Sequence, residues 1–187
     1  MYDIKANNCL VYSFGINNEW SFDDGVASYG CKVFAFDPSM KAKEHKRGKN
    51  IHFYPIGIGD QDTSYKYKYL TMKSIIKFLN HDKNDVIIDY LKMDVEGAEV
   101  GFFQETYKNN PDIMNKFKQI GLEIHPGPYR NDLSRYKKLY EIFMKLEDSG
   151  YRLMFSAPNP VPQNNYLNPF LNKVVNGYYE LVWAKVK

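Results

Sequence analysis

The stretch from Ile87 to Glu99 constrains the fold more than any other part of the chain. It reads Ile-Ile-Asp-Tyr-Leu-Lys-Met-Asp-Val-Glu-Gly-Ala-Glu, an apolar run that ends in carboxylates. The run as far as Met93 predicts a buried central strand, and residues 98–107 predict the helix that follows. Ligands of open parallel sheets bind beyond the carboxyl ends of the strands, which places Asp94 and Glu96 well for chemistry. Either carboxylate could instead only cap the following helix.

Strands and helices alternate along the rest of the chain. We expect further strands over residues 9–14, 32–37, 51–58, 119–124, 151–156 and 177–186, and helices over residues 19–29, 71–79 and 133–148. This alternation predicts an α/β fold, with a mostly parallel sheet that has helices on both faces. Only a surface loop, residues 157–172, separates the last two strands, which suits an antiparallel final strand at one edge. The basic run 41–47 is interpreted as the solvated face of a helix.

Length and composition limit the class of protein. The chain has 187 residues and no long linker, which indicates one domain, residues 1–187, with 44% hydrophobic and 25% charged residues. A net charge of +3 gives no strong signal for nucleic acid. We find no secretory signal and no apolar run long enough to span a membrane. We therefore expect a cytoplasmic location by default, unless the chain is a domain of a longer protein. The oligomeric state is left open.

The two cysteines, Cys9 and Cys31, are too few for a disulfide scaffold. Each lies at the start of a predicted strand. If those strands are neighbours, the two sulfur atoms lie side by side. We interpret them as buried free thiols rather than as a bridge.

The turn after the first strand separates two kinds of nucleotide-binding fold. Residues 13–19 read Ser-Phe-Gly-Ile-Asn-Asn-Glu, with a single glycine instead of the three of a pyrophosphate-binding turn. This argues against a nicotinamide oxidoreductase. One glycine can suffice for S-adenosylmethionine, which carries no phosphate. Asp37 ends the second strand, where an acidic residue can accept hydrogen bonds from both ribose hydroxyls. The alternative is that Asp37 is only a turn residue before Pro38.

Several segments resemble one methyltransferase family. Residues 91–99, Leu-Lys-Met-Asp-Val-Glu-Gly-Ala-Glu, resemble the signature of FkbM-type S-adenosylmethionine-dependent methyltransferases. Residues 11–16 with 20–23, residues 33–40 and residues 177–183 resemble the animal methyltransferase-like branch of that group. The resemblance covers the chain from about Cys9 to Val186. It implies a class I, Rossmann-like fold with a seven-stranded, mostly parallel sheet and an antiparallel last strand. Ser13 and Glu19 stand where typical members have an acidic residue and a second glycine.

The resemblance also implies where S-adenosylmethionine would bind. The expected cofactor-binding residues lie at the ends of the first four predicted strands: Ser13, Phe14, Gly15, Asn17, Glu19, Asp37, Pro38, Ser39, Gly57, Ile58, Gly59, Asp60, Lys92, Met93 and Asp94. We expect the adenine near residues 58–60.

The expected catalytic residues are Asp94, Glu96 and His125. An attacking hydroxyl must lose a proton, so it needs a base or a metal ion. Asp94 and Glu123 lie at the ends of two predicted neighbouring strands and could hold Mg²⁺ or Mn²⁺. Without a metal, His125 would be the base, largely neutral at neutral pH, with Asp94 as its orienting partner. The alternative is that His125 is a turn residue packed against Pro126.

These features together predict an O-methyltransferase. The expected acceptor is a hydroxyl of a glycan or of a small hydroxylated molecule, because FkbM-type enzymes often act on sugars and 16 Tyr and 12 Phe could line such a site. The Asp/Asn-Pro-Pro-aromatic motif of nucleobase and glutamine methyltransferases is absent at residues 94–97. Methylation of protein or of nucleic acid stays open, the latter because of the basic stretch 41–49. A catalytically silent nucleotide-binding module is the remaining alternative.

Overall fold

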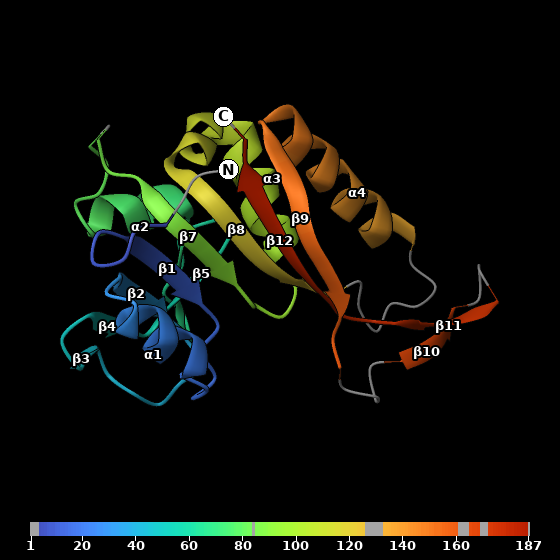
Figure 1. Ribbon diagram of the computed structural model, residues 1–187. Coiled ribbons are helices and arrows are strands. Elements are labelled where there is room, and N and C mark those ends of the chain that lie inside the picture. Colours follow the sequence, from blue (N-terminus) through green and yellow to red (C-terminus); the bar gives the residue numbers. More distant parts are fainter. Residues whose placement is uncertain (1–3, 84, 126–132, 161–164, 169–171, 187) are drawn as a thin grey trace.

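The fold is built on one large twisted sheet. The computed structural model describes residues 4–83, 85–125, 133–160, 165–168 and 172–186. Eight strands form the sheet in the order β3-β4-β2-β1-β7-β8-β12-β9 (Figure 1). Their bounds are β1 (Leu10–Phe14), β2 (Lys32–Phe36), β3 (His45–Arg47), β4 (Ile51–Tyr54), β7 (Ile88–Met93), β8 (Phe117–Ile124), β9 (Tyr151–Pro158) and β12 (Tyr179–Lys185).

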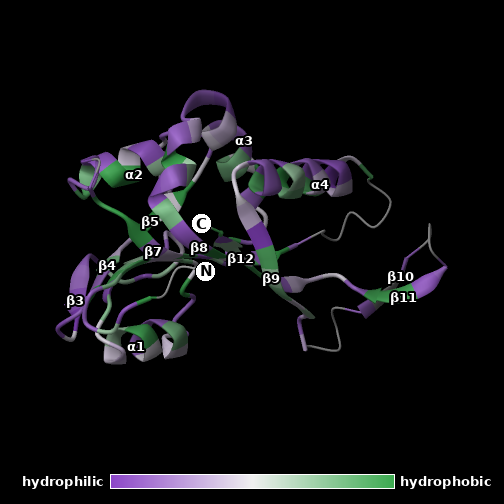
Figure 2. Cartoon of the chain, turned by 45° about the horizontal axis from the view of Figure 1, so that its top comes forward, coloured by the Kyte–Doolittle hydropathy of each residue, from purple (hydrophilic) through white to green (hydrophobic). Residues whose placement is uncertain are grey.

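Helices cover both faces of this sheet, as expected. The helices are α1 (Ser21–Ser28), α2 (Met72–Phe78), α3 (Glu99–Asn109) and α4 (Leu133–Asp148), with a short 3₁₀ helix, η1 (Pro111–Lys116). Figure 2 shows α1 below the sheet and α2, α3 and α4 above it. Thr71 begins α2 as predicted, because its hydroxyl accepts a hydrogen bond from the Ser74 N–H at 3.3 Å. The three layers confirm the predicted α/β class.

Seven of the eight strands have the expected class I arrangement. Strands β1, β2, β4, β7 and β8 are parallel, and β12 runs antiparallel to both of its neighbours. The expectation that this last strand lies at an edge is wrong, because β12 lies between β8 and β9. Helix α4 connects β8 to β9, and the space between these two strands in the sheet is one strand wide. The returning strand β12 fills that gap and satisfies the backbone groups on both sides.

Two small sheets correct other expectations. Pro55 has no N–H to donate, and the third predicted strand divides there into β4 and β5 (Ile56–Ile58). Strand β5 pairs with β6 (Lys68–Leu70) instead of with the main sheet. The expected loop 157–172 contains β10 (Asn165–Asn168), which pairs with β11 (Lys173–Asn176) in a hairpin that projects from the body (Figure 1). The basic run 41–47 is not a helix, because its end forms the exposed edge strand β3.

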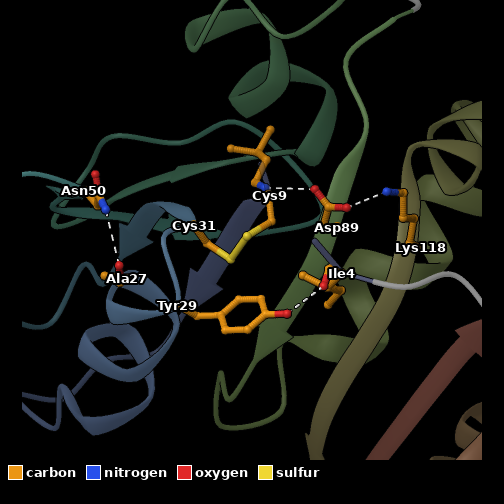
Figure 3. Close-up of a disulfide and its surroundings, with 9 residues drawn as sticks. Ile4, Cys9, Ala27, Tyr29, Cys31, Asn50, Asp89 and Lys118 are labelled. Carbon is orange, nitrogen blue, oxygen red and sulfur yellow. Dashed lines mark hydrogen bonds and ion pairs between the residues drawn. A yellow bond between two sulfur atoms is a disulfide. The ribbon is translucent and has the colours of Figure 1, made fainter. Parts of the chain in front are cut away.

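A disulfide joins Cys9 to Cys31, so the expectation of free thiols is wrong (Figure 3). The register of β1 against β2 pairs Leu10 with Lys32, which places the two preceding residues opposite each other. Both cysteines are buried beneath α1, together with Val11 and Val33. The pairing of β1 with β2 in the fold therefore brings the two cysteines into a disulfide that their spacing in the sequence does not predict.

Replacing both cysteines by serine should destabilise the fold. The bridge spans 22 residues of sequence, and closing a loop of that size is worth about 3 kcal/mol of unfolding free energy. Urea unfolding followed by circular dichroism measures the loss, and the reduced parent protein is the matched control. Equal stability of the parent and the variant, with both thiols of the native parent open to alkylation, would contradict the bridge.

Candidate active site

The turn at Gly15 is the first part of the site. Strand β1 ends at Phe14, and Gly15 has a φ of +79°, in the left-handed region that favours glycine. A Cβ placed on Gly15 would lie 1.6 Å from the carbonyl oxygen of Asp94. The Asp94 N–H donates to the Phe14 carbonyl at 3.1 Å, so the ends of β1 and β7 are joined backbone to backbone. The single glycine of the turn is therefore required for this close approach.

Asp37 closes the same turn from β2. One carboxylate oxygen accepts hydrogen bonds from the N–H groups of Ile16 and Asn17 at 2.9 and 2.8 Å. The other accepts from the N–H and the hydroxyl of Ser39 at 2.7 and 2.6 Å. Burial opposes ionisation of Asp37, but these bonds outweigh it and lower the pKa of the carboxyl below its usual value. The structure gives Asp37 a turn-closing role, and its contact with a ribose stays a prediction.

A cavity of about 310 Å³ opens between these turns, at the carboxyl ends of the parallel strands. It is lined by Phe14, Gly15, Asn17, Phe36, Asp37, Pro38, Ser39, Gly57, Ile58, Tyr69, Asp94, Val95, Glu96 and Ala98. Nine of the expected cofactor-binding residues are in this set: Phe14, Gly15, Asn17, Asp37, Pro38, Ser39, Gly57, Ile58 and Asp94. This is the edge at which ligands of parallel α/β sheets bind.

The other expected cofactor residues lie around this cavity without lining it. Glu19 is exposed, and its carboxylate accepts hydrogen bonds from the N–H and hydroxyl of Ser21 at the start of α1. Ser13 and Met93 are fully buried in the sheet. Lys92 donates to the Gly15 carbonyl at 3.0 Å and so supports the turn from below.

The remaining two expected residues, Gly59 and Asp60, line a second, adjoining cavity. This cavity shares Ile58, Tyr69 and Ala98 with the first. Tyr69 was not predicted. It reaches the site because β6 pairs with β5. Its ring packs directly on Gly57, where the Cβ of any other residue would lie 2.5 Å from the ring. Only the unexpected small sheet brings this aromatic ring to the cavity, so no local sequence signal pointed to it.

His125 is the centre of a charged cluster beside the first cavity. It follows β8 directly, and only 6% of its surface is exposed. Its Nε2 lies 3.6 Å from a carboxylate oxygen of Glu123 and 3.9 Å from one of Glu96, and its Nδ1 lies 3.5 Å from Glu99. The Tyr178 ring packs edge to face against the imidazole, with 4.6 Å between the two ring centroids. The expected packing partner, Pro126, lies outside the described residues.

Two unpredicted residues hold this cluster in place. Glu99 is 1% exposed, and its carboxylate accepts the Gly97 N–H at 3.1 Å, so Glu99 rather than Glu96 supports the start of α3. Glu96 leaves 85% of its side chain exposed. Arg135 of α4 donates to the carbonyl oxygens of His125 and Gly97 at 2.7 and 3.3 Å and lies 3.8 Å from Glu99. Both residues reach the site through packing of α3 and α4, which the periodicity of a helix does not reveal.

The cluster changes the ionisation of its members. Burial and the neighbouring Glu123 raise the pKa of Asp94 to about 7, whereas the neighbouring His125 lowers the pKa of Glu123 to about 2. Burial disfavours the charged form of His125, but Glu123, Glu99 and Glu96 outweigh it and raise its pKa to about 10. The expectation of a largely neutral imidazole is therefore wrong, since three carboxylates hold the proton on the ring. In this state the group suited to accept a proton near neutral pH is Asp94.

Comparison with known proteins gives the family. A family model described as "Methyltransferase domain" matches residues 2–171. The chain belongs to this methyltransferase family. It is 28% identical over 168 residues to the human "Probable methyltransferase-like protein 24" and 26% identical over 165 residues to the rat protein of the same name. These alignments cover 83% and 81% of the chain but only 44% of each relative, so the chain spans less than half the length of these relatives.

A structural comparison agrees on the fold alone. "Putative hemolysin from Streptococcus thermophilus" superposes with a TM-score of 0.55 at 11% identity, covering 98% of this chain and 62% of that one. Among the residues that the structure describes, no helix of this methyltransferase domain is both long and apolar enough to cross a membrane.

We predict that the imidazole of His125 stays protonated through the neutral range. Its raised pKa, about 10, places its titration well above the ordinary value. Proton NMR of the histidine ring signals between about pH 5 and 8 should show no midpoint for His125. His81 is the internal control. Burial and then nearby lysines lower its pKa, so its ring should be largely neutral at the upper end of this range. A midpoint near the ordinary value for His125 would contradict the carboxylate cluster.

Proposed function

We propose that this domain transfers the methyl group of S-adenosylmethionine to a hydroxyl of a sugar, in a glycan or a related hydroxylated molecule. One observation carries the proposal. Asp94 lines the cavity above the Gly15 turn and also belongs to the His125 cluster, so the cavity and the cluster share one residue, which is also the candidate base. Membership of a methyltransferase family supports methyl transfer, and the resemblance of residues 91–99 to FkbM-type enzymes supports the hydroxyl acceptor.

The residues of the cavity fit this cofactor. The Gly15 turn allows a close backbone approach without a phosphate-binding pattern, and Asp37 stays ionised at the end of β2. Its Oδ1 bonds to the Ser39 hydroxyl, which can rotate away when ribose hydroxyls donate instead. Tyr69 and Ile58 provide apolar surface for an adenine. When bound, the cofactor supplies an electrophilic methyl group.

We predict that Asp37→Asn weakens S-adenosylhomocysteine binding by about 1.5–3 kcal/mol, the scale of hydrogen bonds to a charged group. Isothermal titration calorimetry gives the dissociation constants. Asp24→Asn is the matched control, because Asp24 pairs with Arg47 on the surface, away from the cavity. Unchanged affinity in a folded Asp37 variant would remove the ribose contact from the proposal.

The acceptor hydroxyl must give up its proton to a base. We assign Asp94 as this base, because its pKa of about 7 suits proton transfer at neutral pH. Glu123 is the anionic partner in this pair, and the imidazolium of His125 stabilises that charge. Lys92 lies 3.8 Å from Asp94 and compensates the carboxylate once it is ionised. His125 thus orients and neutralises its neighbours instead of removing the proton.

The same cluster offers a second route through a divalent cation. One ligand atom each of Asp94, Glu96 and His125 lies within 4.8 Å of the others. These ligands suit Mn²⁺ or Mg²⁺, and the contact of His125 with Glu99 has the form of an outer-shell carboxylate partner. Glu123, which the sequence suggested as a ligand, lies beside Asp94 and is not a member of this group. On this route the cation would lower the pKa of the acceptor hydroxyl.

Turnover should depend on the ionisation of Asp94. The base must be deprotonated, so we expect kcat to rise with pH through about 7 and then level off. Asp94→Asn should lower kcat by about 10²–10⁴-fold, because it removes the base. A rate that does not vary over this range would exclude Asp94 from proton transfer.

Two controls separate the proton route from the metal route. Glu96 is largely exposed and outside the Asp94–Glu123 pair, so Glu96→Gln should leave kcat nearly unchanged on the proton route. On the metal route the same variant, or exhaustive chelation, should abolish activity, and added Mn²⁺ should restore the chelated parent. Binding of S-adenosylhomocysteine without transfer to any acceptor would favour the silent module.

The disulfide is relevant to the compartment in which the protein would act on its acceptor. Disulfides persist in oxidising compartments and are rare in the cytosol. The Cys9–Cys31 bridge therefore favours a luminal or extracellular setting over the expected cytoplasmic one. Glycans are abundant in such settings, which supports a sugar over a nucleic acid.

A further inference from the structure

We propose that the acceptor sugar binds in a groove on the α1 side of the sheet, over β7, β8, β12 and β9. This inference rests on the proposed function and adds the acceptor subsite. The groove has a volume of about 330 Å³, and its walls carry Phe22, Tyr90, Asp94, Glu123, Phe155 and Glu180. None of the aromatic residues in it belongs to the cofactor cavity.

The groove exists because one face of the sheet is only partly covered. Helix α1 packs over β2 and β4, and in the described part of the chain no helix lies on this side over β8, β12 and β9 (Figure 2). Gly121 deepens the floor, because a Cβ there would lie 2.2 Å from the Tyr90 hydroxyl. The Tyr90 side chain can therefore lie across β8 instead of standing up from the sheet.

The walls combine the two kinds of contact that a sugar ring needs. Phe155 stands at the rim with 53% of its surface exposed, and the Phe22 and Tyr90 rings lie 5.6 Å apart. Such rings pack against the apolar face of a sugar. The carboxylates of Glu123 and Glu180 accept hydrogen bonds from hydroxyl groups.

The charges in the groove favour a neutral polyol over an amine. Lys92 lines the groove 3.8 Å from Asp94, and the His125 ring lies 3.6 Å from Glu123. These cations compensate two of the three carboxylates of the groove, Asp94 and Glu123, and leave Glu180 to accept hydrogen bonds. An ammonium group would meet Lys92 and the His125 imidazolium as like charges at the shared Asp94 end, whereas hydroxyl groups can both donate and accept.

Asp94 connects this groove to the cofactor cavity, because it lines both. A hydroxyl of a ring held in the groove can therefore give its proton to Asp94 while its oxygen points to the methyl group at the adjoining end of the cofactor cavity. This arrangement brings the two reactants to one carboxylate without either crossing the sheet.

The test measures ligand binding and does not depend on turnover. The probes are methyl glycosides of the common hexoses, followed by saturation-transfer NMR, and S-adenosylhomocysteine, followed by calorimetry. Phe155→Ala and Glu180→Gln should each raise the glycoside dissociation constant at least about tenfold and leave the S-adenosylhomocysteine constant within about twofold, as expected for residues of only one of the two subsites. Leu153→Ala is the matched control, because Leu153 is 46% exposed on the same strand, pairs with Trp183 and does not line the groove.

The outcomes separate the two proposals. Loss of glycoside binding in both groove variants, with the Leu153 variant unchanged, supports the subsite. Equal glycoside binding by the parent and both groove variants would overturn it, as would a parent that binds S-adenosylhomocysteine but no glycoside. A parent that binds methylammonium in the groove in place of glycosides would overturn the neutral-polyol class. Failure of the parent to bind S-adenosylhomocysteine would count against the proposed function, and the glycoside titration would still decide whether the groove binds sugar.

Discussion

The packing of the Gly15 turn against the backbone of Asp94 is the contact on which the site depends. It brings the Asp94 carbonyl oxygen to within 1.6 Å of where a Cβ on Gly15 would lie, so no other residue type can occupy this position without moving one of the strands. Asp37 and Lys92 secure the turn from two sides through its N–H groups and its carbonyl. The cavity on one side and the charged cluster on the other both depend on this junction.

The charged cluster shows how burial changes the role of a residue. Two largely buried carboxylates, Glu99 and Glu123, stabilise the imidazolium of His125 strongly, because ion pairs are much stronger in a low-dielectric setting than in water, and the exposed Glu96 adds a weaker contribution. The same burial leaves Asp94 reluctant to ionise beside Glu123. Two groups with nearly opposite tendencies therefore lie side by side, which is a common arrangement at sites of proton transfer. Arg135 lies next to Glu99 and supplies a further positive charge, which limits the net negative charge of the cluster.

The sheet leaves one of its faces unevenly covered, and this has a consequence for binding. Helices α2, α3 and α4 bury the large core on one side, whereas the smaller core under α1 ends near β1. Strand β9 consequently leaves Phe155 exposed at the groove, next to the carboxylates of Glu123 and Glu180. An exposed aromatic side chain next to carboxylates is more typical of a binding surface than of a finished core.

The sequence by itself determined the class of fold and the edge of the sheet at which the site lies. Apolar periodicity located the main strands and helices, and the glycine turn, Asp37 and the residues 94–97 identified the carboxyl ends of the right strands, because these signals are local. The tertiary structure alone decided the place of β12, the bond between Cys9 and Cys31, and the contacts of Tyr69, Glu99 and Arg135 with the site. It also raises the pKa of His125, since the pKa of a side chain depends on its neighbours in space and not on its neighbours in the chain.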